Sequence, residues 1–127
     1  MKFERENTKQ IDFPSQKQVE LSLSHLKGSK RSYASLTSDS GDFIQMAGGG
    51  FSCILEKSIN GTVYRANQLE KVIHFNEVTS LHTTCGEFEV EPNEYFSIDQ
   101  IKEAFVRFLS GERDFNNYQW KNLEIKT

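Results

Sequence analysis

Asn60-Gly61 is the sequence feature that most limits how this chain can fold. Both residues tolerate the positive φ angles of a type I′ turn, the two-residue connection between antiparallel strands. Phe51–Lys57 before the pair and Thr62–Ala66 after it alternate between apolar and polar side chains, as strands with one buried face do. The pair therefore predicts a β-hairpin, and with it an antiparallel sheet in the middle of the chain.

Apolar or alternating segments on both sides of the hairpin predict further strands. They are Arg31–Ser38, Phe43–Ala47, Val72–Phe75, Thr79–Thr84 and Glu87–Glu91. In the last of these, Phe88 and Val90 are expected to face a core while the glutamates face the other way. The glycines 48–50 are expected to form a loop or bulge, because no phosphate-binding motif surrounds them. Residues 1–12 are expected to be a ragged lead-in, with at most one short strand near Gln10–Phe13.

Two amphipathic helices are predicted, one on each side of the strands. Each begins with a capping box, in which a serine accepts an amide hydrogen bond and a glutamine three residues later reaches back. The boxes pair Ser15 with Gln18 and Ser97 with Gln100, and Gly28 and Gly111 are expected to end the helices. The predicted fold is α+β: a mostly antiparallel, meandering sheet of five to six strands, with an N-terminal helix over Ser15–Lys27 and a C-terminal helix packed on it.

Composition narrows the classes of function. The 127 residues fit a single domain, 1–127, and a net charge of −3 argues against a nucleic-acid-binding face and an anionic membrane surface. No window approaches the roughly 18 apolar residues of a membrane span, and the first residues do not open a signal peptide. Two cysteines are too few for a secreted disulfide scaffold. We expect a cytoplasmic protein with no membrane contact and no direct nucleic-acid contact.

Side chains able to bind metal or act as nucleophiles are few. His74, His82 and Cys85 are grouped, but neither a CxxC pair nor an HExxH motif accompanies them. We therefore expect no metal site and no cofactor. Cys53 is expected to be a small buried hydrophobe. A catalytic pair of Cys85 or Cys53 with His74 or His82 stays open as an alternative, because such partners meet only in the fold.

Four glutamates near the end of the strand region are candidate binding residues. Glu87, Glu89 and Glu91 alternate along one strand, so they share a face at a spacing of about 7 Å, and Glu94 follows them. A solvated sheet face accounts for such a row. The alternative is an acidic stripe that docks onto a basic partner surface and steers association. Asp39 and Asp42, in a neighbouring turn, are the second choice for such a surface.

The order of these segments resembles a known protein family. The segments are Ser32–Leu36, Asp42–Gly49, Phe51–Glu56, Val63–Ala66 and Ile98–Gly111. They look like the small α+β immunity proteins of bacterial polymorphic-toxin and contact-dependent growth inhibition systems, in particular the family found beside deaminase or nuclease toxins. In that family a "ylq-agG" strand, a "hYRa" hairpin strand and a final "A-F-x-x-F-L-x-G" helix recur in this order. The resemblance covers roughly residues 15–120.

The resemblance implies a non-enzymatic inhibitor that has no catalytic residues. Such a protein is made in the cytosol and binds the C-terminal domain of one cognate toxin, blocking its active site or an adjacent surface. A toxin that acts on nucleic acid must present a basic surface to phosphate, which an acidic partner can occupy. The expected toxin-binding residues are therefore Glu87, Glu89, Glu91, Glu94, Asp39 and Asp42.

The segment Glu70–Glu94 departs from the family pattern, and we expect toxin specificity to reside there. The protein is expected to be a monomer or a weak dimer. Two other interpretations stay open: a small cysteine-dependent enzyme, and a generic protein-interaction or oligomerisation domain.

Overall fold

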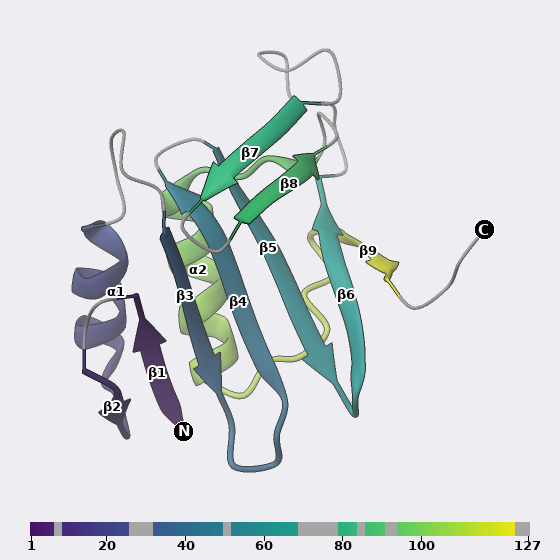
Figure 1. The fold of residues 1–127 in the computed structure, drawn as a ribbon. Coiled ribbons are helices and arrows are strands. Elements are labelled where there is room, and N and C mark those ends of the chain that lie inside the picture. The colour runs from purple at the N-terminus through teal and green to yellow at the C-terminus, as the bar shows by residue number, and fades with distance from the viewer. Residues whose placement is uncertain are drawn as a thin grey trace.

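Both helices pack on one face of an antiparallel sheet in the computed structural model, which describes residues 1–6, 9–25, 32–49, 52–68, 79–83, 86–90 and 94–123 (Figure 1). The strands are β1 (Lys2–Arg5), β2 (Ile11–Asp12), β3 (Ser32–Thr37), β4 (Phe43–Gly49), β5 (Ser52–Ile59), β6 (Thr62–Asn67), β7 (Thr79–Thr83), β8 (Gly86–Val90) and β9 (Gln119–Asn122). The helices are α1 (Gln16–Ser24) and α2 (Ile98–Leu109). The predicted α+β class is confirmed.

The main sheet has seven strands in the order β2-β1-β3-β4-β5-β6-β9, so the predicted five to six were too few. The N-terminal segment supplies two of them: β1 pairs with β3 and places Phe3 opposite Leu36, and β2 pairs with β1. Residues 1–12 are thus not only a lead-in. The strands β7 and β8 form a separate two-stranded sheet that crosses one end of the main sheet, on the face away from α2 (Figure 1).

The predicted hairpin between β5 and β6 is confirmed. Asn60 and Gly61 have φ angles of 51° and 85°, as a type I′ turn requires. The expectation for the glycine run was wrong at two positions, because Gly48 and Gly49 continue β4 and pair with Cys53 and Ser52. Gly50 lies outside the described residues.

Both predicted capping boxes are present. The Ser15 Oγ accepts from the Gln18 amide at 3.1 Å, and the Ser97 Oγ accepts from the Gln100 amide at 3.3 Å. The helix α1 ends at Ser24, earlier than the expected Lys27, which lies outside the described residues together with Gly28. Gly111 follows the end of α2 with a φ of 106°, as expected of a residue that closes a helix.

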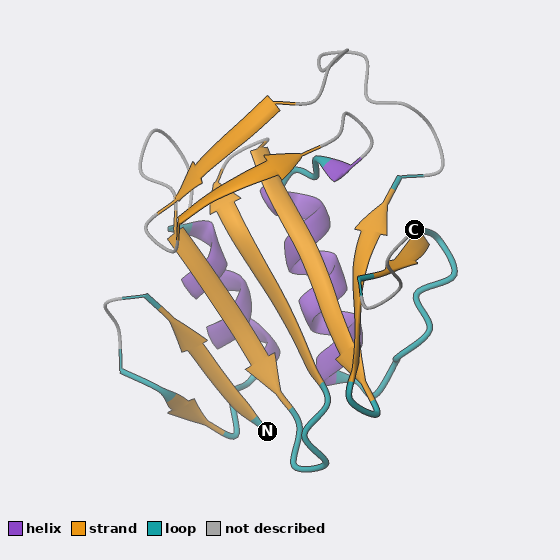
Figure 2. Ribbon diagram, turned by 45° about the vertical axis from the view of Figure 1, so that its right-hand side comes forward, coloured by secondary structure: helices purple, strands orange, loops and turns teal. Residues whose placement is uncertain are grey.

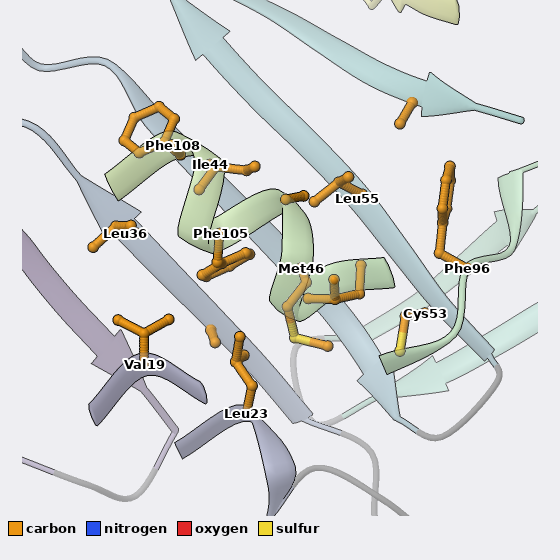
Figure 3. Close-up of a cluster of buried hydrophobic side chains, with 14 of the residues drawn as sticks. Val19, Leu23, Leu36, Ile44, Met46, Cys53, Leu55, Phe96, Phe105 and Phe108 are labelled. Carbon is orange, nitrogen blue, oxygen red and sulfur yellow. The ribbon is translucent and has the colours of Figure 1, made fainter. Parts of the chain in front are cut away.

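The hydrophobic core fills the space between the helices and the sheet (Figure 3). The core includes Leu36, Ile44, Met46 and Leu55 from the strands, and Val19, Leu23, Phe105 and Phe108 from the helices. On α2 the buried residues Ile101, Ala104, Phe105 and Phe108 recur at helical spacing, so one face of the helix is apolar. Burying each large side chain contributes about 1.5–3 kcal/mol, which makes this layer the main source of stability.

The segment that leads into α2 pairs with the first part of β5, which is not paired with β6. The strands β5 and β6 are paired over Glu56–Ile59, and Cys53 further along β5 instead exchanges two backbone hydrogen bonds with Phe96, at 3.0 and 2.8 Å. The Gln68 side chain at the end of β6 donates to the Tyr95 carbonyl at 2.6 Å. This arrangement places Phe96 in the core and brings the neighbouring Glu94 to β6.

Candidate functional site

A row of polar residues crosses the face of the main sheet that is turned away from the helices, which we call the outer face. Residues paired directly across neighbouring strands point to the same side of a sheet. The strand pairings align one residue from each of six strands: Glu4, Ser35, Gln45, Glu56, Arg65 and Lys121. Their chain neighbours Leu36, Ile44 and Leu55 are in the core, so this polar row lies on the outer face.

The centre of the polar row is a network of charged side chains held out of water. The Arg65 guanidinium donates to the Glu56 carboxylate through Nε at 3.0 Å and Nη2 at 2.9 Å, and its Nη1 lies 3.7 Å from Glu94. The Gln45 amide donates to the other oxygen of Glu56 at 2.8 Å. The side chains of Arg65, Glu56 and Glu94 are only 16%, 13% and 5% exposed. One guanidinium therefore contacts two carboxylates, Glu56 and Glu94.

A pocket of about 220 Å³ opens beside this network. Its walls come from three neighbouring strands: Tyr33, Ala34, Ser35, Gln45, Met46, Ala47, Ile54 and Glu56. Ala47 and Ile54 are directly paired and buried although they lie outside the core, at the end of the sheet that β7 and β8 cross (Figure 2). The pocket is smaller than the 300–1,000 Å³ typical of small-molecule sites, and it suits a single amino-acid side chain.

The structure describes five of the six acidic residues predicted from sequence, and they lie on different elements. Glu87 and Glu89 are on β8, paired with His82 and Ser80, and Glu91 lies outside the described residues. Glu94 is buried next to Arg65, so it belongs to the charged network of the outer face.

Asp39 and Asp42 lie in the β3–β4 connection, at the end of the sheet opposite to β7 and β8 (Figure 1). Asp39 is exposed and pairs with the N-terminal amine at 3.0 Å. Asp42 accepts from the Asn60 amide at 3.0 Å and lies 3.6 Å from the Arg113 guanidinium. Asp42 therefore joins two turns of the sheet to the segment after α2.

Sequence reasoning missed the residues that line the pocket. Tyr33, Ser35, Gln45 and Glu56 are unremarkable polar positions in separate strands, and no motif connects them. Strand register is the signal that could have found them. The Asn60-Gly61 turn sets Glu56 opposite Arg65, and residues paired with these two in the neighbouring strands belong to the same polar row.

Of the four cysteine and histidine candidates, only Cys53 and His82 lie within the described residues. Cys53 is fully buried in the core, so its thiol is not accessible as a nucleophile (Figure 3). His82 lies on β7, while Cys85 and His74 are outside the described residues. In the part of the chain that the structure describes, no group of three or more His, Cys, Asp or Glu could hold a metal ion.

Lys57 is a buried cation on the helix side of the sheet. Its ammonium donates to the carbonyls of Arg113 and Asp114 at 2.6 and 3.0 Å and lies 4.2 Å from the centre of the Trp120 ring. Burial lowers the pKa of Lys57 below its usual 10.5, against the opposing effect of Asp114. These contacts hold the segment after α2 against the sheet.

No protein-family model matches this chain, and no curated protein matches it in sequence. Neither helix of the described residues is long and apolar enough to cross a membrane.

Proposed function

We propose that this chain is a non-enzymatic immunity protein that binds and neutralises a cognate toxin domain, one that acts on nucleic acid, in the producing cell. The resemblance on which the proposal draws is carried by four strands that are neighbours in the main sheet and by the helix that packs on them. They form β3, β4, the β5–β6 hairpin and α2. The quoted motifs thus belong to the central scaffold of the molecule.

The observation that carries the proposal is the polar row with its pocket on the outer face. Charged groups held rigidly and largely out of water give an interface specificity, because a partner must match their positions. The network contains two carboxylates, Glu56 and Glu94, and carboxylates are the groups that pair with the basic surface of a toxin that acts on nucleic acid.

The strand β8, which contains Glu87 and Glu89, lies over one end of the outer face, so we propose that these two residues extend the acidic surface there (Figure 2). Glu91, which lies outside the described residues, is proposed as a toxin contact from the sequence pattern alone. Glu94 contributes from within the charged network. Asp39 and Asp42, at the far end, are proposed as secondary contacts. The complete surface would combine acidic residues at its ends, which speed association, with a buried charged network at its centre, which sets specificity.

Co-expression tests the proposal. The protein is expressed with the C-terminal domain encoded immediately upstream, and growth and co-purification are measured. We expect the upstream domain alone to arrest growth, and this protein to restore growth and to co-purify with the domain. A toxic upstream domain that is neither neutralised nor bound would refute the proposal.

A charge-reversal pair tests where the toxin binds. We expect Glu87→Lys with Glu89→Lys to weaken toxin binding at least about tenfold, because like charges then meet across the interface. The matched control is Glu20→Lys with Glu103→Lys, which makes the same change of charge on α1 and α2. Equal effects of the two double variants would show that net charge, rather than the outer face, governs association.

A further inference from the structure

Phe13, in the connection between β2 and α1, combines two unfavourable features. It is 84% exposed, the most of any large hydrophobic residue that the structure describes. Its φ angle is 52°, in the left-handed region where a bulky side chain strains the backbone. Single exposed hydrophobic side chains are common on protein surfaces, so the left-handed backbone is what distinguishes Phe13.

The two other left-handed residues besides glycine, within the described ranges, each have a structural reason. Asn60, with a φ of 51°, belongs to the type I′ turn, and asparagine tolerates this conformation. Phe115, also at 51°, is only 1% exposed, so burial of its ring in the core offsets the strain of its backbone. Phe13 has neither reason: it lies outside a hairpin turn, and its ring is in water.

The neighbours of Phe13 fix its backbone in this conformation. Its amide donates to the Met1 carbonyl at 2.9 Å, next to the paired residues of β1 and β2. The following residue, Pro14, is buried, and Ser15 then caps α1. A proline disfavours the right-handed helical conformation in the residue before it, which opposes an extension of α1 back to Phe13. Strain that the surrounding structure holds in place concentrates at ligand-binding and catalytic sites, so it points to a function for this residue.

The surface beside Phe13 is hollowed and mainly polar. The hollow has a volume of about 240 Å³ and is lined by Met1, Lys2, Gln10, Asp12, Phe13 and Asp39. Its charges are balanced, because Asp39 pairs with the N-terminal amine and Lys2 lies opposite Asp12 in the sheet. An aromatic side chain beside a polar rim is the usual arrangement of an anchor residue in a protein interface. A balanced rim gives no attraction to an anionic lipid surface, which favours a protein as the partner.

We propose that Phe13 is an anchor residue for the toxin domain and that its ring enters an apolar pocket on that partner. Asp39, which lines the same hollow, is one of the residues proposed above to contact the toxin, so the anchor extends that contact surface. The backbone of Phe13 is fixed before the partner arrives, so less conformational entropy is lost on binding. This inference rests on the proposed function, because it takes the partner to be the toxin domain.

Two substitutions separate the ring from the backbone. Phe13→Ala removes the ring and keeps the strain, whereas Phe13→Asn removes the ring and relieves the strain, since asparagine tolerates such φ angles, as Asn60 does. We expect both variants to bind the C-terminal domain encoded immediately upstream at least about tenfold more weakly than wild type, measured by isothermal titration calorimetry. We expect Phe13→Asn, and not Phe13→Ala, to be more stable than wild type, with a folding equilibrium constant at least about twofold higher in urea denaturation.

Leu21→Asn is the matched control. Leu21 is the next most exposed of the large hydrophobic residues described, and it lies within α1. We expect the control to leave the affinity for the toxin domain unchanged and to lower stability, because asparagine is a poorer helix former than leucine. A loss of affinity equal to that of Phe13→Asn would mean that exposed hydrophobic side chains contribute regardless of position, and it would overturn the proposal.

The proposal is also overturned if either Phe13 variant binds the toxin domain as tightly as wild type, or if Phe13→Asn is no more stable than wild type. Sedimentation that shows self-association of wild type but not of Phe13→Ala would overturn it as well, because the ring would then bind a second copy of the chain. Its failure is distinguishable from failure of the proposed function. Binding by wild type with unaffected variants overturns this proposal alone, whereas absence of binding by wild type overturns both.

Discussion

The two faces of the main sheet use the same strands for opposite purposes. On the covered face, Leu36, Ile44 and Leu55 alternate into a continuous apolar layer that the two helices bury. On the outer face, the intervening Ser35, Gln45 and Glu56 form a polar row centred on an ion-pair network. Successive residues of each strand therefore build the hydrophobic core and the polar outer face in turn. We expect that residues of the outer face can be changed with little loss of stability, whereas residues of the core cannot.

The largest effect is expected in the covered layer, from Phe105→Ala. Phe105 is fully buried in the core and contacts the Phe3 ring edge-on, with 6.3 Å between ring centroids. Truncation leaves a cavity, so we expect a loss of about 3–5 kcal/mol in the free energy of unfolding, measured by urea denaturation. A loss below about 1 kcal/mol would mean that α2 is not the helix that closes the core.

The second-largest effect is expected from breaking the charged network of the outer face. Arg65→Ala removes the guanidinium that contacts Glu56 and Glu94, and it leaves the largely buried Glu56 carboxylate without its cation. We expect a loss of about 2–3 kcal/mol, below the full cost of a completely buried pair because some solvent reaches the site. The matched control is Arg107→Ala, whose exposed pairs with Glu103 and Glu112 are worth about 0.5 kcal/mol. Equal losses would show that burial of the network adds nothing.

Lys57→Met tests the one charged residue found buried on the helix side of the sheet among the described positions. The change removes two hydrogen bonds to the carbonyls of Arg113 and Asp114 but also relieves a buried charge. We expect a net loss of about 1–2 kcal/mol near neutral pH, measured by urea denaturation. An increase in stability would mean that the cost of burying the ammonium exceeds the value of its contacts.

The difference in stability between wild type and Lys57→Met is also expected to depend on pH. Burial lowers the native pKa of Lys57, so between that value and 10.5 the unfolded chain binds more protons than the folded one, and stability attributable to Lys57 rises with pH. Tyr118 acts in the opposite sense: burial raises its pKa above 10.0, and its contribution falls as pH passes that value. Tyr118 is common to both proteins. We therefore expect the stability of wild type relative to Lys57→Met to rise through the alkaline range, and a constant or falling difference would contradict this.

The smallest effect is expected from two residues that line the pocket, Tyr33 and Ser35. Tyr33→Phe with Ser35→Ala removes two hydroxyls that make no hydrogen bond within the described residues, so the free energy of unfolding should change by less than about 0.5 kcal/mol. Leu36→Ala, one residue along the same strand, should cost about 2–5 kcal/mol. Similar losses of stability in the double variant and in Leu36→Ala would show that the two faces of the sheet do not differ in their contribution to stability.

Local signals explain what could be predicted from sequence. The Asn60-Gly61 turn and the capping boxes at Ser15 and Ser97 act within a few residues, and the structure contains each of them. The strand β1 could not be predicted in this way, because its short polar segment is held by pairing with β3, far along the chain. The pocket is harder to predict than β1, because it depends on the mutual register of three strands, which no single segment encodes.

The hydrogen bond from Gln68 to Tyr95 has a consequence for how such a protein can diversify. It holds together the two points at which the chain leaves the main sheet after β6 and returns to it before α2. With its ends pinned, the intervening stretch acts as an insertion, and changing its length alters the entropy of loop closure only logarithmically, by about 0.6 kcal/mol per doubling. Chains of this fold could therefore differ in the length and sequence of this stretch while the scaffold and its folding remain the same.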